Sequence, residues 1–225
     1  MIPLKQIQSA KHIAVVVSSD ELLPSGSVLY TYLLRLHKKV SFVYQTDILD
    51  GRFSCLPWFD KLRDTSVPSA DLTIELDESF FTLYEFFKSN DIVINKKMAT
   101  ALYASLLVKH DGFVGGDADG MVFAKASELM ACGADYKLCN EFIIKRVTLA
   151  RLRLKSLMLK NMVLKNGAKD AIFYLSDDDL KRSGATLRDA KEIIKEALCL
   201  EYVTKVILMK SDEDNKILKL IDKEK

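Results

Sequence analysis

Acidic side chains follow two of the apolar runs in this sequence, and they are the ligands that hard divalent cations require. Asp20 and Glu21 come shortly after the first run, and Asp77 comes directly after a later one. Asp111 is a fourth carboxylate, in a polar stretch further along. Magnesium and manganese prefer oxygen ligands, and several carboxylates must converge to neutralise each cation. If these four side chains meet in the fold, they can hold one or two divalent cations.

Two residues that could take part in proton transfer or charge stabilisation precede the last of these carboxylates. His110 is adjacent to Asp111, and an imidazole beside a carboxylate is a candidate general base. Adjacent side chains point in different directions, however, so a structural role for His110 is the favoured interpretation. Lys109 adds a positive charge at the same point of the chain.

Small hydroxyl side chains surround the start of the first predicted helix. Ser19, Ser25 and Ser27 are accompanied by Gly26. Hydroxyl groups and free backbone N–H groups at a helix N-terminus are suited to an anion such as phosphate. Open α/β sheets also bind ligands outside the carboxyl ends of their strands. These four residues are therefore the predicted location of any bound ligand.

The elements that position these residues have the order strand, loop, helix, strand. Residues 12–18 (HIAVVVS) form a continuous apolar run, which is typical of a strand buried on both faces of a parallel sheet. Residues 18–27 contain a proline and a glycine and are predicted as a loop. Helical spacing follows at residues 27–37, and residues 39–44 predict a second strand. This order is that of a right-handed βαβ unit.

Further along the chain, the pattern changes twice. A third strand is predicted at residues 72–76, and helical patterns follow it up to a long helix at residues 148–164. A strand at residues 171–175 then begins a second series of capped helices and strands. The basic residues of the long helix are interpreted as a solvated face.

The overall pattern predicts an α/β fold with a doubly wound, mostly parallel sheet and a second, smaller α/β domain. We expect a first domain at residues 1–112, a helical connector at residues 113–167 and a truncated C-terminal domain at residues 168–225.

Composition excludes several classes of protein. The formal net charge is only +2, so a surface covered with basic residues for nucleic-acid binding is not expected. Four cysteines and three histidines show no zinc-binding spacing, which indicates free thiols in a reducing compartment. No apolar run approaches the ~20 residues needed to span a bilayer. We therefore expect a cytoplasmic protein without membrane contact.

One long segment carries a family resemblance. Residues 101–164 resemble the middle of the DHH-family phosphoesterases, most closely the RecJ-like oligoribonucleases that also dephosphorylate 3′-phosphoadenosine 5′-phosphate. Residues 7–44 are similar to the family's opening strand, loop, helix and strand. Residues 180–186 (LKRSGAT) resemble the start of its small second domain. The resemblance implies two domains and a site for two divalent cations, usually manganese, which bracket a phosphate ester.

The sequence departs from the family pattern at most of the positions that hold those cations. The first loop reads SSDELLPSGS, in which Gly26 and Ser27 match but the family's histidine is absent. Asp77 matches an aspartate ligand, yet the Asp-His-His segment is missing, and the chain passes through residues 78–80 directly towards a helix. Lys109 stands where the family has a metal-binding aspartate. An ammonium a few ångströms from a dication repels it by on the order of several kcal/mol.

These departures predict a degenerate homologue without two-metal hydrolysis and without a metal cofactor. It would be retained as a module that binds a nucleotide or short oligonucleotide, or a protein partner. Lys109 would replace the lost cation by pairing with Asp77. The alternative is an active, divergent phosphoesterase that binds manganese or magnesium through Asp20, Glu21, Asp77 and Asp111. A structural subunit without a ligand, and a homodimer through a free sheet edge of the second domain, also remain open.

Overall fold

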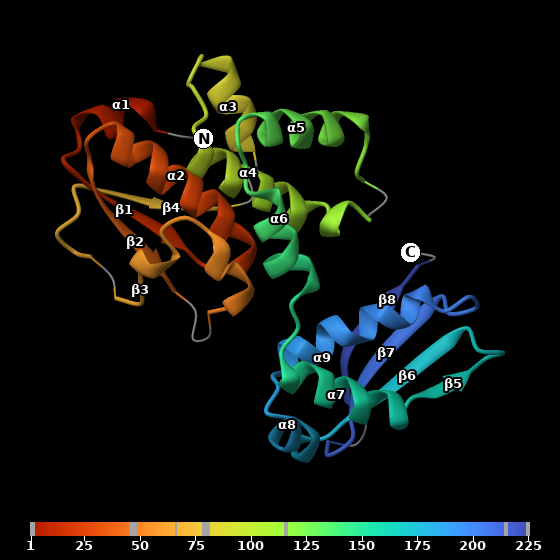
Figure 1. Ribbon diagram of the computed structural model, residues 1–225. Coiled ribbons are helices and arrows are strands. Elements are labelled where there is room, and N and C mark those ends of the chain that lie inside the picture. Colours follow the sequence, from red (N-terminus) through yellow and green to blue (C-terminus); the bar gives the residue numbers. More distant parts are fainter. Residues whose placement is uncertain are drawn as a thin grey trace. The chain divides into compact units, whose positions relative to one another are not determined.

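A computed structural model describes residues 3–45, 49–65, 67–77, 82–114, 117–213 and 216–223. The chain divides into two compact units, Met1–Arg146 and Val147–Lys225 (Figure 1). Each unit has its own cluster of buried apolar side chains, as expected of a domain. No helix in the described part of the chain is both long and apolar enough to cross a lipid bilayer.

The first unit contains most of the helices and a four-stranded sheet. Its described elements are α1 (Leu4–Ser9), β1 (His12–Val17), η1 (Asp20–Leu22), α2 (Leu23–Arg35), β2 (Lys39–Tyr44), η2 (Gly51–Cys55), η3 (Phe59–Lys61), β3 (Leu62–Arg63), β4 (Leu72–Glu75), α3 (Leu83–Ser89), α4 (Lys96–Lys109), η5 (Asp111–Phe113), α5 (Gly120–Ala131), α6 (Tyr136–Cys139) and η6 (Asn140–Lys145).

The second unit is smaller and also contains a four-stranded sheet. Its described elements are α7 (Leu149–Lys160), β5 (Val163–Lys165), β6 (Asp170–Leu175), α8 (Asp177–Ser183), α9 (Leu187–Ile193), η7 (Ile194–Cys199), β7 (Lys205–Lys210) and β8 (Lys216–Asp222). Of the residues 113–167 that were expected as a connector, α5 and α6 belong to the first unit and α7 belongs to the second.

The sheet of the first unit is parallel throughout, with the strand order β3-β2-β1-β4. β1 lies between β2 and β4, and all six of its residues are buried. This burial explains why residues 13–17 of β1 are a continuous run of apolar side chains. The second sheet has the order β5-β6-β7-β8 and is mixed, because only β6 and β7 are parallel. The predicted α/β class, with a parallel sheet and a smaller second domain, is confirmed.

Helix α2, which corresponds to the predicted helix at residues 27–37, begins earlier than the sequence predicts. Residues 18–27 were expected to form a loop, but α2 starts at Leu23 and already contains Pro24 and Gly26. Pro24 occupies one of the first two helical positions, where a proline removes no helical hydrogen bond. The glycine has a packing role instead, because α2 lies directly on the strands β1 and β2. Both residues were therefore misread as loop signals.

The predicted long helix at residues 148–164 is too long. α7 ends at Lys160, and Val163–Lys165 forms strand β5, which pairs with β6 in antiparallel orientation. Val163 and Leu164 continue the apolar spacing of the helix, so periodicity alone does not reveal the change. Pairing with the edge of β6 decides the local structure here.

A carboxylate fixes the amino-terminal end of the first sheet. Asp71 Oδ2 accepts hydrogen bonds from the backbone N–H of His12 at 2.8 Å and of Lys11 at 2.9 Å. These backbone donors lower the pKa of the Asp71 carboxyl. The contact aligns the start of β1 with the start of β4, so the carboxyl ends of these parallel strands also meet at one edge.

Candidate functional site

The carboxyl edge of the parallel sheet is the candidate site, because the strand-following residues of the first unit gather there. β1 is followed by Ser19 and Asp20, and β4 is followed by Asp77. The backbone N–H of Gln45, directly after β2, bonds to the carbonyl oxygen of Val17 at 3.0 Å. Ligands of open α/β sheets bind at this edge.

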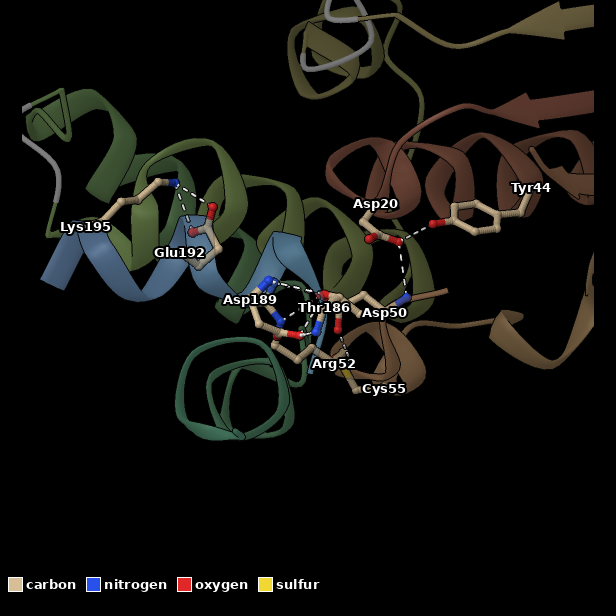
Figure 2. A network of polar contacts seen from close by, with 9 residues as sticks. All are labelled: Asp20, Tyr44, Asp50, Arg52, Cys55, Thr186, Asp189, Glu192 and Lys195. Atoms are coloured by element: carbon tan, nitrogen blue, oxygen red, sulfur yellow. Dashed lines mark hydrogen bonds and ion pairs between the residues drawn. The ribbon is translucent and has the colours of Figure 1, made fainter. Parts of the chain in front are cut away.

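Asp20 is the most buried acidic side chain at this edge. It is 2% exposed and lies at the start of η1. Its Oδ1 accepts a hydrogen bond from the hydroxyl of Tyr44 at 2.6 Å and another from the backbone N–H of Asp50 at 3.3 Å (Figure 2). Tyr44 is the last residue of β2, so the neighbouring strand supplies the donor. The buried carboxylate therefore joins the ends of β1 and β2 to the segment that leads into η2.

Asp50 and Arg52 extend this network along η2. The Asp50 carboxylate accepts from the backbone N–H of Arg52 at 2.9 Å and pairs with its guanidinium, with Nε at 2.9 Å and Nη2 at 2.8 Å. A fork of this kind holds both side chains in one arrangement. The thiol of Cys55 then bonds to the carbonyl oxygen of Arg52 at 3.7 Å. The network thus runs without a break from Asp20 to the end of η2.

Figure 2 also draws polar contacts that belong to the second unit alone. Thr186 and Asp189 form a capping box at the start of α9, and Lys195 pairs with Glu192 at 2.9 Å. Thr186 is the N-cap of α9, and its hydroxyl and the Asp189 carboxylate satisfy free N–H groups at the helix start.

Two of the three serine hydroxyl groups that were predicted to bind an anion make contacts with other residues of the protein instead. Ser25 Oγ lies 3.4 Å from Ser105 Oγ of α4, and Ser27 Oγ donates to the carbonyl oxygen of Pro57 at 2.7 Å. Both serines are buried within α2, whereas Ser19 is half-buried before η1. Of the predicted serines, Ser19 is thus the one placed to meet a ligand at the sheet edge. The assignment of these residues to a ligand stays a prediction.

Gly26 has a steric reason for lacking a side chain. A Cβ atom at this position would lie 2.7 Å from Phe42 Cε2 and 2.8 Å from Val17 Cγ2. Both distances are well inside van der Waals contact, so α2 can lie this close to the sheet only with glycine at this position. The match of Gly26 to the family loop is therefore explained by packing.

We expect Gly26→Ala to destabilise the first unit by about 1–3 kcal/mol, the usual cost of inserting a methyl group into a filled core. Urea unfolding followed by circular dichroism measures this change. Gly120→Ala is the matched control, because a Cβ there meets no atom within 4 Å and Gly120 is also in the first turn of a helix. A Gly26→Ala protein as stable as the Gly120→Ala protein would contradict the packing argument.

Asp77 and Lys109 both belong to the first unit, and their side chains are exposed. Asp77 lies two residues beyond the end of β4, and Lys109 is the last residue of α4. The predicted ion pair between them stays a prediction. The predicted passage through residues 78–80 into a helix lies outside the residues that the structure describes, and α3 begins at Leu83.

The acidic partner of His110 is Asp117 and not the adjacent Asp111. Its Nδ1 lies 2.9 Å from Oδ2 of Asp117, and the imidazole is buried while the carboxylate is exposed. Asp111 is exposed and has a positive φ of 45°, as part of the short turn η5. The pairing with Asp117 has no periodic signal in the sequence, because α4 ends at Lys109 and His110 and Asp117 do not share one regular helix.

The described carboxylates do not form a donor set for two divalent cations. Within the described ranges, no three His, Cys, Asp or Glu side chains are grouped so that they could hold a metal ion. Glu21 is exposed, whereas Asp20 is buried and hydrogen-bonded to Tyr44. A hard cation needs several converging oxygen ligands. The described residues therefore do not fit the two-cation site that the family resemblance implies.

Comparison with known proteins bears on the fold. No protein-family model matches the chain, and no curated protein matches it. Among solved structures, an exopolyphosphatase-related protein from Bacteroides fragilis is similar, with a TM-score of 0.73 and 16% sequence identity over 95% of this chain and 79% of that protein. This likeness shows a shared fold.

A second solved structure is much less similar. It is described as a family II inorganic pyrophosphatase from Methanococcus jannaschii, with a TM-score of 0.30 and 12% identity over 88% of this chain and 64% of that protein. A score of this size does not indicate a shared fold, so the architecture is supported by the Bacteroides fragilis protein and not by this one.

Proposed function

We propose that this chain is a DHH-type phosphoesterase homologue that lacks two-metal hydrolysis and binds a nucleotide or short oligonucleotide. The hydrogen bonding of Asp20 carries the proposal. A carboxylate that binds a cation must direct its lone pairs at the metal. Asp20 Oδ1 instead accepts hydrogens from Tyr44 and from the backbone of Asp50, and the side chain is 2% exposed. Asp20 thus holds the sheet edge together through Oδ1.

The charge at the end of α4 supports the same conclusion. Lys109 occupies the position at which the resembling family has a metal-binding aspartate. An ammonium group attracts a phosphate, whereas it repels a nearby dication by on the order of several kcal/mol. Lys109 therefore favours a phosphate without a metal. The description of the fold neighbour as exopolyphosphatase-related is compatible with a phosphate-containing ligand.

The proposed ligand position is the carboxyl edge of the parallel sheet, near Ser19 and Asp77. The similarity of residues 101–164 to the RecJ-like branch makes a nucleotide phosphate the ligand class to test first. A role in binding a protein partner, or a second copy of this chain, belongs to the same proposal of a retained module. We place this module in the cytoplasm, in keeping with its four free thiols.

Binding and turnover should be measured on the same full-length protein. Isothermal titration calorimetry with 3′-phosphoadenosine 5′-phosphate and with a dinucleotide, each with and without manganese, is expected to show binding that manganese does not require. Chromatography of the same mixtures is expected to show intact ligand. Lys109→Ala should weaken binding about tenfold, which corresponds to ~1.4 kcal/mol. Lys160→Ala, at the exposed end of α7, is the matched control.

Two outcomes would replace this proposal. Manganese-dependent turnover that Asp77→Ala abolishes would establish the alternative, an active divergent phosphoesterase that uses Asp20, Glu21, Asp77 and Asp111. Absence of both binding and turnover would contradict the nucleotide ligand and leave the protein-interaction role.

A further inference from the structure

The sheet of the second unit has apolar side chains on both of its faces. Successive side chains of a strand point to opposite faces of a sheet. On β6, Phe173 and its alternate neighbours Ala171 and Leu175 belong to the buried apolar cluster, in which they pack with residues of α7 and α9 (Figure 1). Ile172 points to the other face, which is called the Ile172 face below. It is only 5% exposed, although it is not among the described residues of that cluster.

The strand register extends the Ile172 face across the four strands β5 to β8. Two apolar rows cross it, of which the first contains Val163, Ile172, Ile207 and Leu220 and the second contains Tyr174, Met209 and Ile217. Registered residues of neighbouring strands lie side by side on one face, so these side chains form one surface. Val163, Leu220 and Ile217 are 40%, 49% and 53% exposed. An exposed surface of several adjacent apolar side chains is typical of a binding surface.

A row of charged residues borders the apolar rows at one end of the Ile172 face. The row contains Lys165, Asp170, Lys205 and Asp222, one from each strand. The charges therefore alternate in sign from β5 to β8. Lys205 Nζ lies 3.6 Å from Asp222 Oδ2, so neighbours in the row attract each other. Read in the opposite direction, the row has the opposite sign at every position, and it is thus complementary to its own reverse.

We propose that the Ile172 face binds a second copy of this chain, with a two-fold axis that runs parallel to the strands between β6 and β7. This axis reverses the strand order, so β5 faces β8 of the second copy and β6 faces its β7. Lys165 then lies opposite Asp222 of the second copy, and Asp170 lies opposite its Lys205. The apolar rows meet beside them, as the inner faces of two aligned sheets do. Both copies use the same surface, which is the rule for two-fold dimers.

The charged row selects this axis and this partner. An axis across the strands would place the charged row on the row of Tyr174, Met209 and Ile217. Four charged side chains would then be buried without partners, which is costly. A protein surface of a single sign would meet two like charges of the row, which costs affinity. A second copy supplies an opposite charge at all four positions. This contact, which the proposed function leaves open, does not depend on the nucleotide ligand.

The mass of the full-length protein in solution tests this interface. Sedimentation velocity over a range of concentrations should show a dimer, with twice the 25.4 kDa of one chain, that dissociates on dilution. Leu220→Glu should weaken the dimer by at least about tenfold, because it buries a charge among apolar side chains. Leu152→Glu is the matched control, since Leu152 is 50% exposed, close to the 49% of Leu220, and belongs to α7, which packs on the other face. Circular dichroism shows whether both variants are folded.

A charge exchange distinguishes contact between copies from contact within one chain. β5 and β8 are the two edge strands of the sheet, about 14 Å apart at the usual strand spacing, so Lys165 and Asp222 cannot pair within one chain. Lys165→Glu and Asp222→Lys should each weaken the dimer by about tenfold, because each places like charges opposite each other. The double variant should dimerise more tightly than either single variant, because the pair forms again with reversed polarity.

Three outcomes would overturn the proposal. A wild-type protein that stays monomeric at every concentration would indicate a different occupant of the Ile172 face. A dimer that is as stable in Leu220→Glu as in Leu152→Glu would place the interface elsewhere. A double charge variant no tighter than the single variants would exclude the two-fold axis. Calorimetry with a nucleotide on Leu220→Glu should give the wild-type affinity, so failure of the dimer and failure of nucleotide binding are seen separately.

Discussion

Phe42→Ala will lower the free energy of unfolding of the first unit by about 3–5 kcal/mol, the range measured for removing a buried aromatic ring. Phe42 is 2% exposed and lies on β2, under the helix α2. Its ring stacks on Tyr30 with centroids 5.3 Å apart and an interplanar angle of 26°. Alanine would leave a cavity between the sheet and α2, and it would also remove this aromatic contact.

The single tryptophan makes the measurement specific to this unit. Trp58 lies 5.7 Å from Tyr30 between ring centroids, so its fluorescence reports on the unit that contains Phe42. Urea unfolding followed at this residue should show a lower midpoint for Phe42→Ala. Phe123→Ala is the matched control, because Phe123 of α5 is 51% exposed and its loss should cost less than about 1 kcal/mol. Equal losses in the two variants would contradict the assignment of Phe42 to the core.

A double-mutant cycle links this prediction to Gly26. The Cβ of Gly26→Ala collides with the ring of Phe42, which is absent in Phe42→Ala. The cost of Gly26→Ala should therefore fall in the Phe42→Ala background, with a coupling of about 0.5–3 kcal/mol. Val17 still lies close to the new methyl group, so part of the cost should remain. Additive losses would show that the helix and the sheet do not meet at this point.

Strand β1 was predictable because its burial on both faces gives a continuous apolar run, and shorter apolar patterns marked β2 and β4. β1, β2 and β4 all lie where the apolar runs placed them, within one or two residues at each end. The start of helix α2 was predicted too late because Pro24 and Gly26 are residue types typical of loops. Both also fit the closely packed first turn of a helix, and the sequence does not distinguish the two cases. Strand β5 was missed because tertiary pairing decides its structure.

The candidate site was predictable only in its location. The carboxyl ends of parallel strands meet, so Asp20 and Asp77 could be assigned to one edge from the strand pattern alone. The partners of Asp20 could not be assigned, because Tyr44 belongs to the neighbouring strand and Asp50 to an irregular segment. Hydrogen bonds between distant segments leave no periodic pattern in a sequence.

Tyr44→Phe will destabilise the first unit by about 1.5–3 kcal/mol, because it deletes a hydrogen bond to a buried carboxylate. The hydroxyl lies 2.6 Å from Asp20 Oδ1, and both side chains are at most 5% exposed. The phenyl ring would keep the volume of the core nearly unchanged, so the decrease in the free energy of unfolding measures the contribution of the hydrogen bond. Tyr136→Phe is the matched control, since Tyr136 is 38% exposed.

The same contact decides between a structural and a metal-binding role for Asp20. If the carboxylate holds the sheet edge together, the cost of Tyr44→Phe should shrink in an Asp20→Asn background, because the charged acceptor is gone. Manganese should then leave the melting temperature of the wild-type protein unchanged. A rise in melting temperature with manganese that Asp20→Asn abolishes would show that the cation binds to the folded protein through this side chain. Asp20 would then have to release the Tyr44 hydroxyl to bind metal, and stabilisation of the fold and hydrolysis would compete for one carboxylate.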